Sequence, residues 1–127
     1  MQSYIIEGGR KLEGKVSISG SKNASLPIIA GSILSGRTCK LYNVPNIQDT
    51  QMMFKILEIL GAKVEKKNGK IKIDTSKIKK FEIPPELMHK MRSSVILAGA
   101  LLGRYNKAIF SYPGDCDIWW IHRTSLR

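Results

Sequence analysis

The apolar residues of this chain recur with two different spacings that alternate along the sequence. Spacing of three or four positions predicts two helices that each bury one face, formed by Leu26, Ile29, Ala30, Ile33 and Leu34 and by Met52, Met53, Ile56, Leu57, Ile59 and Leu60. Ser21 or Asn23 can cap the first helix, and Pro27 is expected in its first turn, where a helix tolerates proline. Asp49 is expected to cap the second helix, which Gly61 ends.

Other segments alternate apolar and polar residues, which is typical of strands. They are residues 4–7, 15–19, 38–44, 62–66 and 70–74. Asn68-Gly69 separates the last two, and this dipeptide is the strongest short-range signal for a hairpin. From residue 15 to residue 74 the order is strand, helix, strand, helix, strand, strand, which predicts an α/β unit with right-handed crossovers followed by a hairpin.

A second series of elements starts near residue 84. Pro84 and Pro85 introduce a helix that is expected to run to about Gly103, and residues 107–112 predict another strand. The fold class is therefore α/β, with one complete strand-helix-strand-helix-strand-strand unit and a second that is unfinished. No low-complexity linker separates the two.

Length and composition predict one globular domain. The chain has 127 residues, of which 43% are apolar and 24% charged. It has no apolar run long enough to span a membrane and no secretion signal at its start, so we expect a cytoplasmic protein without a membrane partner. Its two cysteines, Cys39 and Cys116, lie far apart without the spacing of a metal site, and two reduced thiols are expected.

Charge is the strongest compositional bias, because the formal net charge is +11. Residues 63–80 contain eight lysines and two acids but no arginine, tryptophan, tyrosine or phenylalanine. Nucleic-acid platforms interleave aromatic side chains and guanidinium groups with their charge. The pattern therefore favours a solvated lysine face, and nucleic acid is not the expected partner.

A candidate anion site lies where the strand at residues 15–19 meets the first helix. Lys22 supplies an ammonium group, and the first-turn amide groups around Asn23 supply unpaired donors. Gly20 and small neighbours would let a ligand approach the backbone. A surface lysine followed by an ordinary cap is the alternative reading of the same residues.

Two further residues carry candidate chemistry. Arg92 lies beside a nearly uncharged run of ten residues, and its planar guanidinium suits phosphate or carboxylate, although a side chain reaching out to solvent at a helix start is the commoner explanation. Cys116 follows Pro-Gly-Asp and precedes Asp117. Negative neighbours disfavour the thiolate, so a proton donor is favoured over a resting nucleophile. Cys39, within a predicted strand, is expected to pack rather than react.

Five segments together closely resemble the N-terminal third of the bacterial UDP-N-acetylglucosamine 1-carboxyvinyltransferases, in order over residues 4–118. They are GGRKLEGKVSISGSKNASLPI (Gly8 to Ile28), NVPNIQDT (Asn43 to Thr50), Leu60-Gly61, MRSS (Met91 to Ser94) and PGDC (Pro113 to Cys116). The Lys-Asn-Ala sequence at the helix start points away from the related shikimate-pathway synthase.

The resemblance implies transfer of an enolpyruvyl group from phosphoenolpyruvate to UDP-N-acetylglucosamine, in peptidoglycan precursor synthesis, without metal or organic cofactor. By position, Lys22 and Asn23 match residues that contact phosphoenolpyruvate, and Arg92 matches an arginine that binds UDP-N-acetylglucosamine. Cys116 matches the loop thiol that protonates the methylene carbon of phosphoenolpyruvate and that fosfomycin alkylates.

The chain departs from the family pattern in two places. Asp115 stands where the family loop has glycine, which would stiffen a closing loop and add negative charge beside an anionic substrate. After residue 118 the chain reads WWIHRTSLR, and Ile121 stands where the family has an arginine. Such a loss of similarity is expected of a frame shift with early termination, and the piece is expected to be inactive without the missing remainder.

By analogy with the family, residues 1–21 would be strands of the other domain, residues 22–118 an incomplete catalytic domain, and residues 119–127 a tail outside the family. Two alternatives stay open. The chain can be a basic, non-enzymatic module that binds nucleic acid, or a truncated reading frame without a function of its own.

Overall fold

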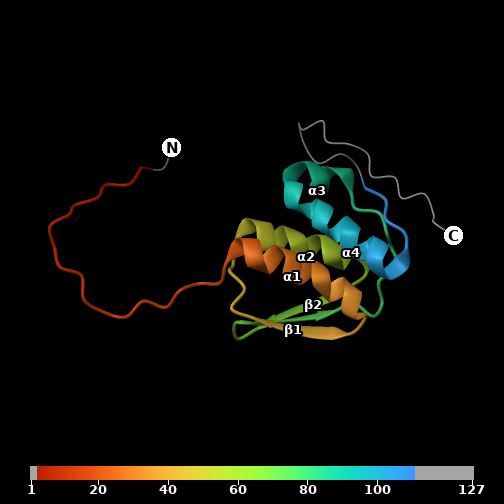
Figure 1. Ribbon diagram of the computed structural model, residues 1–127, viewed down its shortest axis with the longest axis horizontal. Helices are drawn as coiled ribbons and strands as arrows, with labels where there is room; N and C mark the ends of the chain where they lie inside the picture. The colour runs from red at the N-terminus through yellow and green to blue at the C-terminus, as the bar shows by residue number, and fades with distance from the viewer. Residues whose placement is uncertain (1–2, 111–127) are drawn as a thin grey trace.

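The computed structural model describes residues 3–110, which form one α/β unit preceded by an extended segment (Figure 1). A small sheet is covered on one face by helices. The elements are α1 (Lys22–Ser35), β1 (Thr38–Tyr42), α2 (Gln48–Leu60), β2 (Lys63–Lys67), β3 (Lys70–Asp74), α3 (Pro85–Lys90), the 3₁₀ turn η1 (Arg92–Ser94) and α4 (Val95–Tyr105). Within residues 3–110, none of the helices is long and apolar enough to cross a bilayer.

The sheet has the strand order β1-β3-β2, and both pairs are antiparallel. β1 and β2 are therefore parallel to each other with β3 between them, and α2 connects β1 to β2. The hairpin between β2 and β3 turns at Asn68 and Gly69, whose φ angles of 49° and 70° are those of a type I′ turn. The predicted hairpin is confirmed.

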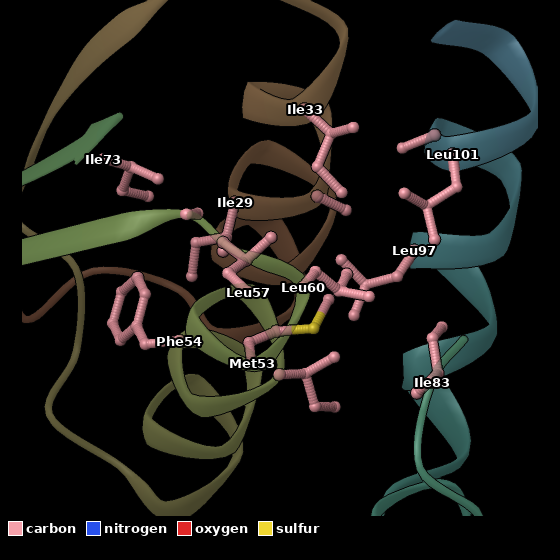
Figure 2. Packing of buried hydrophobic residues seen from close by; sticks show 14 of the residues in the cluster. Ile29, Ile33, Met53, Phe54, Leu57, Leu60, Ile73, Ile83, Leu97 and Leu101 are labelled. Atoms are coloured by element: carbon pink, nitrogen blue, oxygen red, sulfur yellow. The ribbon is translucent and has the colours of Figure 1, made fainter. Parts of the chain in front are cut away.

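The core lies between the sheet and the helices, as Figure 2 shows from close by. Its side chains come from the helices, from β3 and from the segment before α3. Ile29, Ile33, Met53, Leu57, Leu60, Ile73, Ile83, Leu97 and Leu101 are all fully buried. The two apolar helix faces predicted from spacing thus meet in one core.

Two predicted strands do not form. Residues 3–20 have no secondary structure, and their apolar side chains stay in solvent, with Ile5 92% and Ile18 84% exposed. A strand needs a neighbour to pair its N–H and C=O groups, and none of the described segments pairs with this one. Alternation alone therefore identified an extended conformation but not a sheet.

Helix starts also differ from the predictions. Asp49 is the second residue of α2, and the N-cap is Ile47, whose N–H donates to Thr50 Oγ1 at 3.4 Å. Pro27 lies in the second turn of α1, because Ser21 is the N-cap. Since proline has no N–H, the carbonyl of Asn23 lacks its usual donor within the helix.

The helix predicted from Pro84 to about Gly103 is interrupted at Met91, whose φ and ψ of −145° and 102° are extended. α3 ends there, and η1 and α4 follow. Ser94 holds this break, because its buried hydroxyl donates to the Met91 carbonyl oxygen at 2.6 Å. Of the predicted strand at residues 107–112, the described part forms only an isolated parallel bridge between Ile109 and Glu82.

Candidate substrate site

The start of α1 is held against the loop that follows β1. A Cβ on Gly20 would lie 1.8 Å from the carbonyl oxygen of Asn43 and 3.2 Å from Cδ of Pro45. Residues with a side chain cannot approach so closely, so glycine is required here. This contact fixes where α1 begins relative to α2.

Ser21 caps α1 by accepting a hydrogen bond from the Ala24 N–H at 3.4 Å. The next two residues, Lys22 and Asn23, occupy the first turn and are exposed. The Ser25 hydroxyl donates a hydrogen bond to the Ser21 carbonyl oxygen at 2.7 Å. The candidate anion-binding residues therefore lie where the sequence predicted them, at a helix N-terminus with free amide groups nearby.

Lys22 is paired with a carboxylate from the neighbouring helix. Its Nζ lies 2.5 Å from Oδ2 of Asp49, and the two side chains are 53% and 33% exposed. The sequence missed this partner, because it assigned Asp49 to capping α2. Exposed ion pairs stabilise a fold by at most about 1 kcal/mol, so an anionic ligand can displace the carboxylate.

Arg92 lies at the break between α3 and α4. It begins η1, and its side chain is exposed. Among residues 3–110 it has no ion-pair partner. The run that follows is apolar and packs into the core through Leu97 and Leu101. The guanidinium therefore lies in solvent, which agrees with the polar surroundings that the sequence predicted.

These residues are carried by helices that run in the same direction. α1 contacts both α2 and α4, and the N-terminal ends of all three lie to the left in Figure 1. Lys22, Asn23 and Asp49 lie in the first turns of α1 and α2, and Arg92 lies in the turn that leads into α4. The turns that contain Lys22, Asn23, Asp49 and Arg92 therefore lie at the same end of the helical layer.

Arg104, which the sequence analysis did not single out, fixes α4 against α1. Its Nη1 donates to the carbonyl oxygens of Ile33 and Thr75, each at 2.9 Å. A Cβ on Gly36 would come within 2.9 Å of its Nη2. These contacts connect the end of α1, the segment after β3 and the end of α4.

The remaining candidate, Cys116, lies outside the described residues, as do Asp115, Asp117 and the divergent tail. Cys39 is half-buried, with Sγ 3.2 Å from the Ser35 hydroxyl, which agrees with a packing role. In the described part of the chain, His, Cys, Asp and Glu side chains do not gather in threes that could hold a metal ion.

Comparison with known proteins identifies the family. The family profile described as EPSP synthase (3-phosphoshikimate 1-carboxyvinyltransferase) matches residues 6–119. UDP-N-acetylglucosamine 1-carboxyvinyltransferase of Geotalea uraniireducens is 48% identical over 118 residues, which is 93% of this chain and 28% of that protein. A second protein of this name, from Carboxydothermus hydrogenoformans, is 44% identical with the same coverage.

A solved structure agrees with these sequences. The enolpyruvyl transferase NikO from Streptomyces tendae superimposes with a TM-score of 0.67 at 26% identity, over 77% of this chain and 23% of that one. The α/β fold class is thus confirmed, and the chain spans about a quarter of the length of the proteins it matches. Since the family profile covers residues 6–119 of 127, the chain belongs to the EPSP synthase family of enolpyruvyl transferases.

Proposed function

We propose that this chain supplies part of the active site of a UDP-N-acetylglucosamine 1-carboxyvinyltransferase. The reaction moves the enolpyruvyl group of phosphoenolpyruvate to the 3-hydroxyl of UDP-N-acetylglucosamine and releases phosphate. The observation that carries the proposal is Lys22, which is exposed in the first turn of α1 within the matched region, beside amide groups that favour an anion. The 44–48% identity to proteins of this name supports the choice of substrates.

Lys22 and Asn23 would bind the phosphate and carboxylate of phosphoenolpyruvate. The substrate would displace Asp49 from the Lys22 ammonium, which lies 2.5 Å away in the free chain. Because Asp49 competes for the same cation, its replacement by asparagine should lower the KM for phosphoenolpyruvate by up to about fivefold, corresponding to roughly 1 kcal/mol. An increased KM would mean that Asp49 instead orients Lys22 for binding.

Arg92 would bind the diphosphate of UDP-N-acetylglucosamine. Its guanidinium is exposed at the break before α4 and can form paired hydrogen bonds with phosphate oxygens. Arg104 acts indirectly, because it holds α4 to α1 and so limits how far Arg92 can move relative to Lys22.

Cys116 would donate a proton to the methylene carbon of phosphoenolpyruvate. The neighbouring carbon then gains oxocarbenium character and is attacked by the sugar 3-hydroxyl, which gives a tetrahedral adduct. Loss of phosphate and of one proton from the new methyl group regenerates the carbon-carbon double bond as an enol ether. Cationic groups around the phosphate stabilise both charged stages.

We also propose that residues 22–118 form part of the catalytic domain and that residues 1–21 pair with the other domain, leaving residues 119–127 as a tail outside it. The exposed, extended conformation of residues 3–20 supports this division. So do apolar side chains left in solvent on α1 and α4, namely Ile28, Leu34, Val95 and Ile96. The three quarters of the relatives that this chain does not match would cover them.

The biological setting follows from the proposed reaction. A nucleotide-sugar acceptor of this kind feeds peptidoglycan synthesis, so the protein would act in the cytoplasm and affect cell-wall formation, cell shape and division. We propose that the reaction uses neither a metal ion nor an organic cofactor, because proton transfer, addition and elimination need only the groups named above.

A chimera tests the proposal. The first 118 residues of this chain replace the matched segment of a full-length relative, and phosphate release is measured with both substrates. We expect turnover that Lys22→Ala and Cys116→Ser each reduce by at least about a hundredfold, while the surface variant Lys77→Ala leaves it unchanged. Asp115→Gly should raise turnover, because it restores loop flexibility and removes a negative charge.

Two further measurements make the test specific. Fosfomycin should add covalently to the chimera at Cys116, detected by mass spectrometry, and should not modify the Cys116→Ser variant. The 127-residue chain alone should release no phosphate. A folded chimera without turnover, or one in which Lys22→Ala is as active as its parent, would contradict the proposed function.

A further inference from the structure

The outward face of the sheet is dominated by lysine. Because side chains alternate along a strand, every second residue of β1, β2 and β3 points away from the helices. Five of these nine positions are lysines and two are acids: Thr38, Lys40 and Tyr42 in β1, Lys63, Glu65 and Lys67 in β2, and Lys70, Lys72 and Asp74 in β3. The helical layer therefore lies on one side of the sheet and a basic surface on the other.

The pairing register adds an aromatic residue that the lysine-rich stretch itself lacks. Tyr42 lies directly opposite Lys70, which in turn lies opposite Lys67. Tyr42 is 60% exposed, and the Lys70 ammonium lies 5.5 Å from the centre of its ring. Residues 63–80 contain neither an aromatic residue nor an arginine, and the fold supplies the aromatic ring from Tyr42, 28 residues before Lys70.

The acids on this face neutralise only one end of it. Glu65 lies 2.8 Å from the Lys63 ammonium and 3.8 Å from that of Lys72. Its pKa is lowered mainly by the hydrogen bond from Lys63, so it stays ionised and paired. Ion pairs to Lys40, Lys67 and Lys70 are absent within residues 3–110. The row with Tyr42 is thus the part where positive charge is not offset.

A groove lies at the hairpin end of the sheet, between the hairpin and the residues that lead into α2. It has a volume of about 280 Å³ and is lined by Val44, Pro45, Asn46, Gln51 and residues 66–71. The Lys66 ammonium donates to Gln51 Oε1, and Gln51 Nε2 donates to Asn46 Oδ1 at 2.6 Å. Because Lys66 and Ile71 are inward positions of β2 and β3, the groove opens on the helix side of the hairpin, and Lys67 and Lys70 border it only at the turn.

We infer that this face binds single-stranded nucleic acid. Lys40, Lys67 and Lys70 contact the phosphates, and the Tyr42 ring stacks on one base. An aromatic ring on a basic sheet surface is the arrangement that binds unstacked bases, whereas a duplex keeps its bases stacked and away from a flat surface.

The number of lysines that contact phosphate sets how steeply the binding constant falls with salt. About three phosphate contacts predict a slope of log K against log salt near −2 for a single strand, so binding weakens roughly 15- to 20-fold between 50 and 200 mM salt. The dissociation constant at 50 mM salt should be about 10–100 μM, in the range of non-specific binding.

The experiment is fluorescence anisotropy of a labelled oligothymidylate of about ten nucleotides, titrated with the 127-residue chain at several salt concentrations. Tyr42→Ala should weaken binding about fivefold or more, and Tyr42→Phe should leave it unchanged, because only the ring is needed. The double variant Lys67→Gln/Lys70→Gln should reduce the slope from about −2 to about −0.7.

Lys55→Gln/Lys79→Gln is the matched control, because it removes the same charge from exposed positions outside the outward face of the sheet. It should bind and depend on salt like the wild type, and circular dichroism should show that every variant is folded. Any of four results would overturn the inference. The first two are absence of binding at 20 mM salt and wild-type affinity of folded Tyr42→Ala. The third is an equal loss of affinity in the Lys67→Gln/Lys70→Gln variant and in the control variant. The fourth is tighter binding to duplex DNA or to phosphatidylglycerol vesicles than to the oligonucleotide.

Discussion

Replacing Arg104 should be among the most destabilising changes that a partly exposed charged residue of this chain allows. Its guanidinium donates to the carbonyl oxygens of Ile33 and Thr75, each at 2.9 Å. Hydrogen bonds from charged groups contribute about 1.5–3 kcal/mol each, and partial exposure reduces that amount. Arg104→Met keeps most of the apolar stem and loses both bonds, so we expect a loss of about 3 kcal/mol.

The assay is thermal unfolding followed by circular dichroism. For an ordered region of this size, 3 kcal/mol lowers Tm by about 12–24 °C. Arg104→Lys keeps the charge near the C-terminus of α4 but lacks the planar fork, and should recover roughly half of the loss. Gly36, whose φ is 63°, allows the guanidinium to lie against the backbone, so a side chain there should have an effect in the same direction.

The matched control is Arg37→Met, which removes an exposed arginine just after α1. It should change stability by less than about 0.5 kcal/mol. A loss below about 1 kcal/mol for Arg104→Met, or one no larger than that of the control, would show that the two hydrogen bonds contribute nothing beyond an ordinary surface charge.

Four other predictions concern three glycines and one carboxylate. Gly20→Ala should lower Tm by several degrees, because the added Cβ would lie 1.8 Å from the Asn43 carbonyl oxygen and the backbone would have to shift. An unchanged melting curve would contradict this close approach. Gly69→Ala should cost about 1 kcal/mol, because its φ of 70° is strained for alanine, whereas Gly99→Ala inside α4, with open space around it, should stabilise by about 0.5–1 kcal/mol. The pKa of Asp74 lies below its ordinary value, chiefly because the Ser76 hydroxyl donates to it, so its contribution to stability is present at neutral pH and is lost as pH falls through that lowered pKa. Ser76→Ala should raise the pKa of Asp74 in a carbon-detected NMR titration, and an unchanged value would contradict the assignment of the cause.

Local signals in the sequence were sufficient for the elements that satisfy their own backbone groups nearby. Gly61 ends α2 with a φ of 113°, and Asn68-Gly69 turns the hairpin, as predicted. The register between β1 and β3 did not follow from local signals, since it joins segments some 30 residues apart. The position of Tyr42 on the lysine face therefore could not be predicted from the sequence.

The predictions that failed depend on partners that a local pattern does not specify. Residues 4–7 and 15–19 alternate like strands but have no neighbour among residues 3–110. Asp49 looked like a cap, but its carboxylate pairs with Lys22 from another helix. Arg104 gave no signal, because its acceptors lie 71 and 29 residues earlier in the chain.

The strand order β1-β3-β2 has a consequence for how the chain folds during synthesis. The central strand is the last of the three to be made, so β1 has no neighbour in this sheet until β3 has been synthesised. Until then α1 and α2 can associate through their apolar faces, while β1 and β2 remain separate. The nascent chain therefore passes through a stage in which the helices are paired but the backbone N–H and C=O groups of β1 and β2 have no partners. Chaperone binding is expected at this stage.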